Sequence, residues 1–235
     1  MDFENLKEVA DLSLFWEYRY FLLRGLAYNF YVFFLSATLA ISMGFLAALM
    51  RMSQWSFVRP FGTLYAELFR NCPEYVLLVW VHYVMPLLLA YLLQAKVNFH
   101  PVVSAVLGLG LAYSGYLTET FRTGIQAIPR GHLEAGRALG MSGGLIMRRI
   151  IIPQAIRQML PEIMNQMVSL FKATTLISLI SVPDLMYQVS IVTQQEMRPL
   201  PLYSGAAVVY FLLILAISNL VDLFSEKWRT QYLTR

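Results

Sequence analysis

The sequence predicts an all-α membrane protein with five transmembrane helices, and its hydropathy and the spacing of its charges carry that prediction. Of its 235 residues, 58% are hydrophobic and 14% are charged, and the mean hydropathy is +0.57. A soluble domain carries about a quarter charged residues. Four runs contain no Asp, Glu, Lys or Arg, namely residues 25–50, 75–95, 97–118 and 199–221. Each can cross the hydrocarbon core once, since about 20 apolar residues suffice.

A fifth crossing is expected within residues 152–182, which are mostly apolar although Arg157, Glu162 and Lys172 interrupt them. Before the first span, residues 12–23 mix aromatic and charged side chains, as is typical of a segment at the membrane–water interface. We therefore expect a single transmembrane domain over residues 1–235, with spans near residues 25–50, 61–93, 101–122, 153–181 and 203–226.

The basic residues predict the orientation of these spans. Placing the N-terminus outside assigns most of the 18 Lys and Arg residues to cytoplasmic segments, as the positive-inside rule requires. The C-terminus and residues 130–152 then face the cytoplasm. The sequence pI of about 9.2 reflects basic loops beside anionic lipid and implies no nucleic acid.

The segment from Glu134 to Pro153 is charged, rich in glycine and set between long apolar runs. A short helix from Gly131 would place small and apolar residues on one face, at i, i+3, i+4 spacing. Gly140 can end that helix because glycine tolerates positive φ, and Ser142 can cap a second short helix. Pro153 suits the first turn of the next span. The segment is expected either to contact another protein or to lie on the membrane surface.

Glu134-Ala135, Gly140 and Ile152-Pro153 together resemble the EAA loop of bacterial ABC importer permeases. Three further segments are similar to the polar amino-acid uptake branch of that family, and they are residues 67–73, 116–131 and 169–176. The resemblance implies the type I ABC importer permease architecture. In that architecture the loop forms coupling helices that dock on a cytoplasmic ATP-binding subunit.

The resemblance also implies which residues couple this chain to the ATPase, and they are Glu134, Ala135, Gly136, Leu139, Gly140, Ile151 and Pro153. Gly136 departs from the family pattern, which has a second alanine there, and lowers the propensity of the first coupling helix by about 1 kcal/mol. Cys72 also departs, because a small hydroxyl residue is common at its position. The implied partners are a cytoplasmic ATP-binding subunit dimer, a second permease subunit (the same or homologous), a periplasmic substrate-binding protein, a polar amino acid and membrane lipid.

The chain contains no G-x-x-x-x-G-K-[ST] phosphate loop. We therefore expect a transport subunit rather than an enzyme, with no catalytic residue, no cofactor bound by this chain and ATP held by the partner ATPase. His82, His100 and His132 lack metal-ligand spacing, so no metal site is expected. The expected location is the bacterial inner membrane, with multiple crossings.

Polar residues at membrane depth predict a substrate pathway, because such groups are costly in lipid and face a bundle interior or a wet cavity. Two helical stripes carry them, with Glu67, Arg70, Asn71 and Glu74 in the second span and Glu162, Asn165, Gln166, Ser169 and Lys172 in the fourth. Pro73 and Pro161 interrupt the backbone hydrogen bonds of these spans. The alternative is that these charges pair for structural reasons, for example Arg70 with Glu74 at i, i+4.

Together these features predict the permease subunit of an ATP-driven importer that carries a polar amino acid across the inner membrane. Five helices enclose a pathway poorly, so we expect a permease dimer. Two other classes stay open: an ion-coupled secondary carrier, with Glu67, Glu74 or Glu162 as its ion-linked carboxylate, and a membrane scaffold without transport. Resemblance around residues 78–87 leans towards an acidic or amide substrate such as glutamate, aspartate or glutamine.

Overall fold

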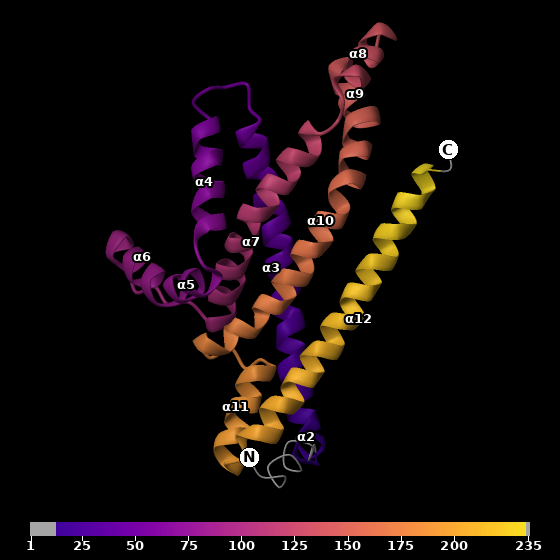
Figure 1. Cartoon of the computed structure of the whole chain (residues 1–235). Coiled ribbons are helices and arrows are strands. Elements are labelled where there is room, and N and C mark those ends of the chain that lie inside the picture. Colours follow the sequence, from indigo (N-terminus) through magenta and orange to yellow (C-terminus); the bar gives the residue numbers. More distant parts are fainter. Residues whose placement is uncertain (1–12, 234–235) are drawn as a thin grey trace. The chain divides into compact units, whose positions relative to one another are not determined.

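The computed structural model describes the backbone of residues 13–233 and the side chains of residues 13–223. All regular elements within those residues are helices (Figure 1). The first are α2 (Ser13–Glu17), α3 (Arg19–Arg51), α4 (Arg59–Asn71), α5 (Glu74–Val79), the π-helix η1 (Trp80–Val84) and α6 (Met85–Leu93). The next are α7 (Pro101–Gln126), α8 (Arg130–Ala138), α9 (Gly143–Ile146) and the π-helix η2 (Met147–Ile151). The last are α10 (Ile152–Ala173), the 3-10 helix η3 (Thr174–Ile180), α11 (Leu185–Glu196) and α12 (Pro199–Leu233).

Five helical stretches among the described residues are long and apolar enough to cross a membrane, which confirms the predicted all-α fold with five transmembrane helices. They are Arg19–Arg51, Glu74–Leu93, Pro101–Gln126, Gly143–Ile180 and Pro199–Leu223. Their bounds differ from the expected ones most in the second and fourth stretches. Residue 12, the first of the expected interfacial run, lies outside the described residues.

The second stretch is shorter than expected because the helix breaks at Cys72 and Pro73. Cys72 has φ −87° and ψ 128°, and Pro73 has φ −57° and ψ 134°, so both are extended. A residue that precedes proline is pushed out of the α region. α4 therefore ends at Asn71, and a separate helix begins at Glu74.

The fourth stretch is longer than expected because α9, η2, α10 and η3 follow one another without a gap from Gly143 to Ile180. Pro153 does not begin a new helix, since η2 leads directly into α10. Pro161 lies inside α10 and removes one backbone donor without ending the helix. The polar stripe predicted in this span therefore lies on an uninterrupted helix.

The chain divides into two compact units, each with its own core. The first comprises Met1–Thr38, Pro73–Gly110 and Val168–Ser218, and the second comprises Leu39–Cys72, Leu111–Met167 and Asn219–Arg235.

In the first unit, the first turns of α3 pack with α11 and the start of α12. The side chains buried there are Leu22, Leu185, Val189, Val192, Leu202, Ala206 and Tyr210. Beside them, the Asn29 amide donates to the Asp184 carboxylate at 3.1 Å and to the Thr174 hydroxyl at 3.1 Å. Asp184 also caps α11 by accepting from the Tyr187 amide at 2.9 Å. Burial raises the pKa of Asp184 to about 7, against the opposing effect of these hydrogen bonds.

In the second unit, α7 packs closely against α3 and α4 because glycines stand where the helices meet. A Cβ atom at Gly44 of α3 would lie 2.9 Å from Leu117 Cβ of α7. A Cβ atom at Gly115 of α7 would lie 2.7 Å from the backbone nitrogen of Arg70 in α4. Small residues allow such close approach of helices in membranes. The approach brings the polar residues of α4 and α7 side by side.

Candidate functional site

The segment after α7 folds into a helical hairpin made of α8 and α9. α8 ends in a Schellman motif, in which the Gly140 amide donates to the Arg137 carbonyl at 2.9 Å and the Met141 amide donates to the Gly136 carbonyl at 3.0 Å. Gly140 has a φ of +72°, a left-handed conformation that glycine adopts without steric cost. Ser142 then occupies the N-cap position of α9 with extended backbone. The turn expected at Gly140 and the helix start expected at Ser142 are confirmed, but the Ser142 side chain forms no capping hydrogen bond.

Gly136 allows the two helices of the hairpin to pack closely. Its position is buried, and a Cβ atom there would lie 2.8 Å from Cγ1 and 3.0 Å from Cδ1 of Ile146. Ile146 is itself fully buried. The departure from the family pattern at Gly136 therefore has a packing reason, because the missing methyl group makes room for Ile146. The close contact between α8 and Ile146 opposes the destabilisation of the helix that glycine causes relative to alanine.

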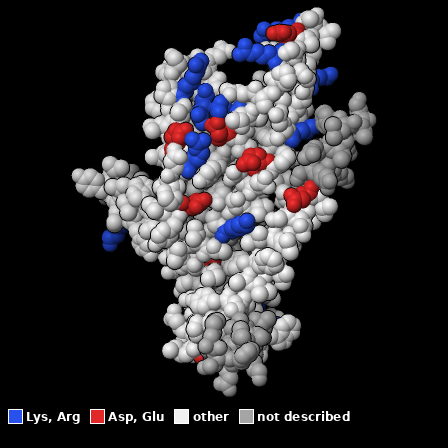
Figure 2. All heavy atoms as spheres, viewed as in Figure 1, with Lys and Arg blue, Asp and Glu red and all other residues white. Residues whose placement is uncertain are grey.

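The outer face of the hairpin combines apolar, small and basic side chains. Leu139 is 81% exposed, and Glu134, Ala135 and Gly140 are exposed beside it. Arginines surround this face, and Figure 2 shows them gathered on the hairpin. Those with exposed side chains are Arg130, Arg137, Arg148 and Arg149. An exposed leucine next to small residues suits a protein contact, because another surface can approach the α8 backbone closely.

The predicted coupling residues therefore divide into two groups. Glu134, Ala135, Leu139 and Gly140 lie on the outer face, where a partner can reach them. Gly136 and Ile151 are buried, and Pro153 is half-buried in the first turn of α10. The first group can form a contact, and the second shapes the hairpin that presents it.

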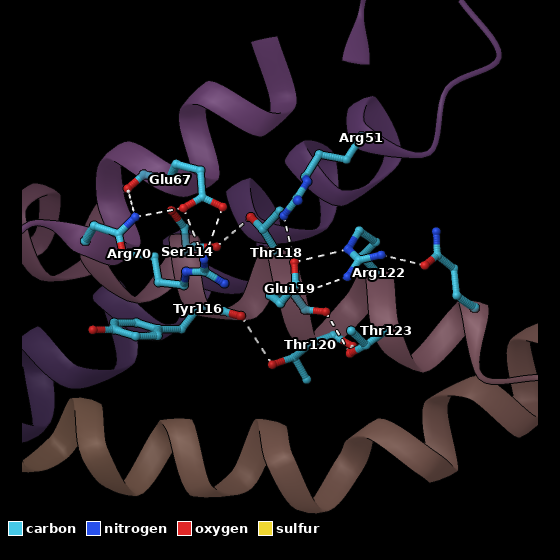
Figure 3. A network of polar contacts seen from close by, with 12 residues as sticks. Arg51, Glu67, Arg70, Ser114, Tyr116, Thr118, Glu119, Thr120, Arg122 and Thr123 are labelled. Atoms are coloured by element: carbon cyan, nitrogen blue, oxygen red, sulfur yellow. Dashed lines mark hydrogen bonds and ion pairs between the residues drawn. The ribbon is translucent and has the colours of Figure 1, made fainter. Parts of the chain in front are cut away.

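A polar network joins the end of α3 to α7 (Figure 3). The Glu119 carboxylate accepts from Arg51 Nη1 at 2.7 Å and from Arg122 Nε at 3.1 Å, and its second oxygen accepts from Arg122 Nη2. Arg122 also donates to the Gln126 side chain at 2.5 Å. The side chains of Arg51 and Glu119 are only 15% and 27% exposed. Glu119 thus pairs with two arginines, balances the charge of one of them and ties the C-terminal turn of α3 to α7.

A second polar cluster lies on α4 in the same view. Arg70 Nη2 lies 3.1 Å from both carboxylate oxygens of Glu67, and Asn71 Nδ2 lies 2.7 Å from one of them. Arg70 pairs within its own helix at i, i+3, as the structural alternative supposes, but its partner is Glu67 rather than Glu74. Glu74 begins α5 beyond the break at Pro73, and it belongs to the other compact unit. The prediction that all four residues share one helical face is therefore wrong for Glu74.

The polar stripe of α10 is open on its outer side. Glu162, Asn165 and Lys172 are exposed, whereas Gln166 and Ser169 are half-buried. The Gln166 amide donates to Glu162 at 2.9 Å. Among the described residues, neither Glu162 nor Lys172 forms a salt bridge, so the structural pairing considered for them is absent there. The charges of Glu162 and Lys172 are therefore available to a molecule that contacts α10.

Two features of the site were not predicted from the sequence. In the sequence Glu119 marks the end of an apolar run, and its i, i+3 spacing to Arg122 is a local signal for an ion pair. The contact of Glu119 with Arg51 joins residues 68 positions apart.

Within the described part of the chain, no group of three or more His, Cys, Asp or Glu side chains could hold a metal ion.

Five membrane-spanning helices, an exposed hairpin between two of them and polar side chains at membrane depth define a membrane-embedded transport component. The chain belongs to the family of binding-protein-dependent transport system inner membrane components, which it matches over residues 40–230. It is therefore an inner membrane protein with multiple crossings, and it is a transport subunit.

Curated relatives cover most of the chain. The Histidine/lysine/arginine/ornithine transport system permease protein HisQ of Escherichia coli (strain K12) is 31% identical over 196 residues, which are 82% of this chain and 86% of that protein. The Glutamate/aspartate import permease protein GltK of Escherichia coli O6:H1 is 30% identical over 208 residues, which are 88% of this chain and 93% of that protein.

Two solved structures share the fold. A crystal structure of an amino acid ABC transporter with histidines matches with a TM-score of 0.83 and 31% identity, over 92% of this chain and 98% of the other. An inward facing structure of the MetNI methionine ABC transporter matches with a TM-score of 0.70 over 90% of this chain and 98% of the other. At 17% identity, the second match shows a common fold alone.

Proposed function

We propose that this chain is the permease subunit of an ATP-driven importer that carries a polar amino acid into the cell. The exposed hairpin of α8 and α9 is the observation that carries the proposal, because its apolar tip at Leu139 lies between the third and fourth candidate spans and suits docking on a second protein. Relatives named for histidine, lysine, arginine and ornithine transport and for glutamate and aspartate import support an amino-acid substrate. Their substrates differ in charge, so the likeness favours the class of polar amino acids rather than one member.

The helical run from Gly143 to Ile180 suggests how docking at the hairpin would reach the substrate. α8 packs on α9 through Gly136 and Ile146, and α9 continues without a gap into α10. A movement of the hairpin tip would therefore be transmitted along one continuous helix to the polar stripe at Glu162. In the proposed cycle, ATP binding closes the ATPase dimer, moves the hairpin and turns the permease from inward- to outward-facing.

The proposed assembly contains a cytoplasmic ATP-binding subunit dimer, a second permease subunit and a periplasmic substrate-binding protein. The exposed charges of α10 support a pathway shared with a second subunit, because a charge facing lipid is costly. No cofactor is assigned to this chain, and ATP would be hydrolysed by the partner.

Uptake by the reconstituted complex tests the proposal. Uptake of radiolabelled polar amino acids should require ATP and the binding protein, and it should persist when ionophores collapse the ion gradients. The reason is that the driving force enters through the hairpin rather than through a carboxylate in the spans. Uptake that ionophores abolish while ATP is present would instead support an ion-coupled carrier that uses Glu67, Glu74 or Glu162. Absence of flux in every condition would support the scaffold.

The proposed orientation places the N-terminus outside and the C-terminus in the cytoplasm, because most basic residues then face inward. A Lys96→Cys variant should react with a membrane-impermeant maleimide in intact spheroplasts, since Lys96 is exposed in the connection between α6 and α7. A reporter fused after Arg235 should be active in the cytoplasm. Labelling of the cysteine only after permeabilisation would show that the topology is inverted.

The stripe on α10 is the proposed contact for the amino acid. A zwitterion in a low-dielectric pathway needs an acceptor for its ammonium group and donors for its carboxylate, because an unpaired buried charge is costly. Glu162→Gln and Gln166→Ala should therefore each change substrate preference or lower the rate of transport about tenfold. A tenfold lower rate corresponds to an activation free energy higher by about 1.4 kcal/mol. Recovery of the ATPase subunit should stay normal, because these residues lie outside the hairpin.

The control for this prediction is Gln195→Ala, which removes an exposed amide on α11 rather than on α10. The measurement is initial uptake rate at equal protein incorporation, with several competing amino acids. Unchanged rate and selectivity in both stripe variants would mean that substrate passes elsewhere and that this face of α10 serves packing.

A further inference from the structure

An apolar groove of about 550 Å³ opens on the first unit, between the N-terminal turns of α3 and the start of α12. Its walls are formed by aliphatic and aromatic side chains, among them Phe15, Leu23, Leu26, Val208 and Val209. Leu23 and Val208 are 59% and 48% exposed, so the groove is open along its side. Its volume falls within the range of about 300–1,000 Å³ that is usual for ligand sites.

The groove lies near the first residues of two candidate membrane spans. It starts beside Arg19, the first residue of the α3 span. On the other wall, the lining residues Gly205, Val208 and Val209 lie six to ten residues after Pro199, the first residue of the last candidate span. Half of the hydrocarbon core is about 15 Å thick. The lining residues of α3 run from Arg19 to Leu26, about 10 Å along a helix, so the groove covers part of one lipid leaflet.

Arg19 is the one basic residue among those that line this groove. The Arg19 guanidinium carbon lies 4.9 Å from the centroid of the Trp16 ring and 4.6 Å from that of Tyr20, and Nη1 donates to the Trp16 carbonyl at 2.9 Å. No carboxylate of the described residues lies within salt-bridge distance of Arg19. Trp16 and Tyr20 are 71% and 74% exposed, as is typical of aromatic residues at the headgroup level. The guanidinium is thus oriented by two rings and has donors left for an anion.

We propose that this groove binds one anionic phospholipid, with an acyl chain along its apolar walls and the phosphate held by Arg19. A groove with apolar walls and one basic lining residue is chemically complementary to an amphiphile with an apolar chain and one anionic head group. A guanidinium is well suited to this role because its planar donors match the oxygens of a phosphate. A peptide segment would present backbone polar groups to the groove, and its apolar walls offer no partners for them.

Native mass spectrometry of the assembled complex in detergent, with added phosphatidylglycerol or phosphatidylcholine, tests the proposal. The wild type should retain phosphatidylglycerol about fivefold more than phosphatidylcholine, because charged hydrogen bonds favour the anionic head. Arg19→Gln should remove this preference. Arg24→Gln should keep it, because Arg24 is exposed on the same helix but does not line the groove.

A second pair of variants tests the acyl-chain part of the groove. Val208→Phe should fill it and lower retention of both lipids, whereas Leu212→Phe, one turn further along α12 and outside the groove, should not. Equal lipid retention in all four variants would overturn the proposal. So would a disulfide between two copies carrying Val208→Cys, since that result would assign the groove to a contact between chains.

Discussion

A Gly140→Asp variant is expected to insert into the membrane normally but to recover at least about tenfold less ATPase subunit than the wild type on purification. Nothing lies within 4 Å of the Cβ position at Gly140, so no neighbour blocks a side chain there, although the φ of +72° strains the backbone of any other residue. The change places a carboxylate next to Leu139, which is 81% exposed and would be covered on docking. An unpaired charge buried in a contact costs several kcal/mol.

Gly140→Asn is the matched control for this variant. Asn and Asp have nearly the same shape, and both tolerate the left-handed backbone that the φ of +72° requires. The two variants therefore differ chiefly in charge, and Gly140→Asn should keep most of the ATPase recovery and stimulated ATP hydrolysis. Equal loss in both variants would mean that the turn geometry matters rather than a docking surface. Normal recovery in Gly140→Asp would remove the hairpin as the ATPase contact.

The number of spans was predictable because it depends on local composition. Each apolar run long enough to cross a membrane can be recognised from the sequence. The four runs without charged residues predicted the positions of most of the spans. The turn at Gly140 was also predictable, because a glycine after a short helical pattern is a local signal. Pro73 was recognised as an interruption, but the sequence alone did not show that it separates two helices belonging to different compact units.

Contacts between distant residues were harder to predict. The role of Gly136 depends on the position of Ile146 across the hairpin, and a missing methyl group looks like a weakness until that neighbour is known. The pairing of Glu119 with Arg51 depends on how α3 meets α7, which no local pattern encodes. The i, i+4 spacing of Arg70 and Glu74 predicted a pair only because one continuous helix was assumed.

Loss of the Glu119 carboxylate is expected to give the largest loss of stability among single changes in the polar network. Glu119→Ala would leave Arg51, whose side chain is only 15% exposed, and Arg122 without their shared counter-charge. Removing one partner of a buried pair costs about 3–5 kcal/mol, and partial exposure here places the expected loss near the lower end. The melting temperature of the purified complex should fall by about 5–10 °C.

Three further variants serve as controls for the Glu119→Ala measurement. Glu162→Ala removes an exposed carboxylate bonded to Gln166 and should change the melting temperature little. Glu119→Gln keeps one acceptor without the charge and should fall between the two. Arg51→Met combined with Glu119→Ala should cost less than the sum of the single changes, because the double variant no longer leaves Arg51 unpaired. If Glu119→Ala is instead as mild as Glu162→Ala, and the double variant is additive, solvation by water rather than Glu119 stabilises these arginines.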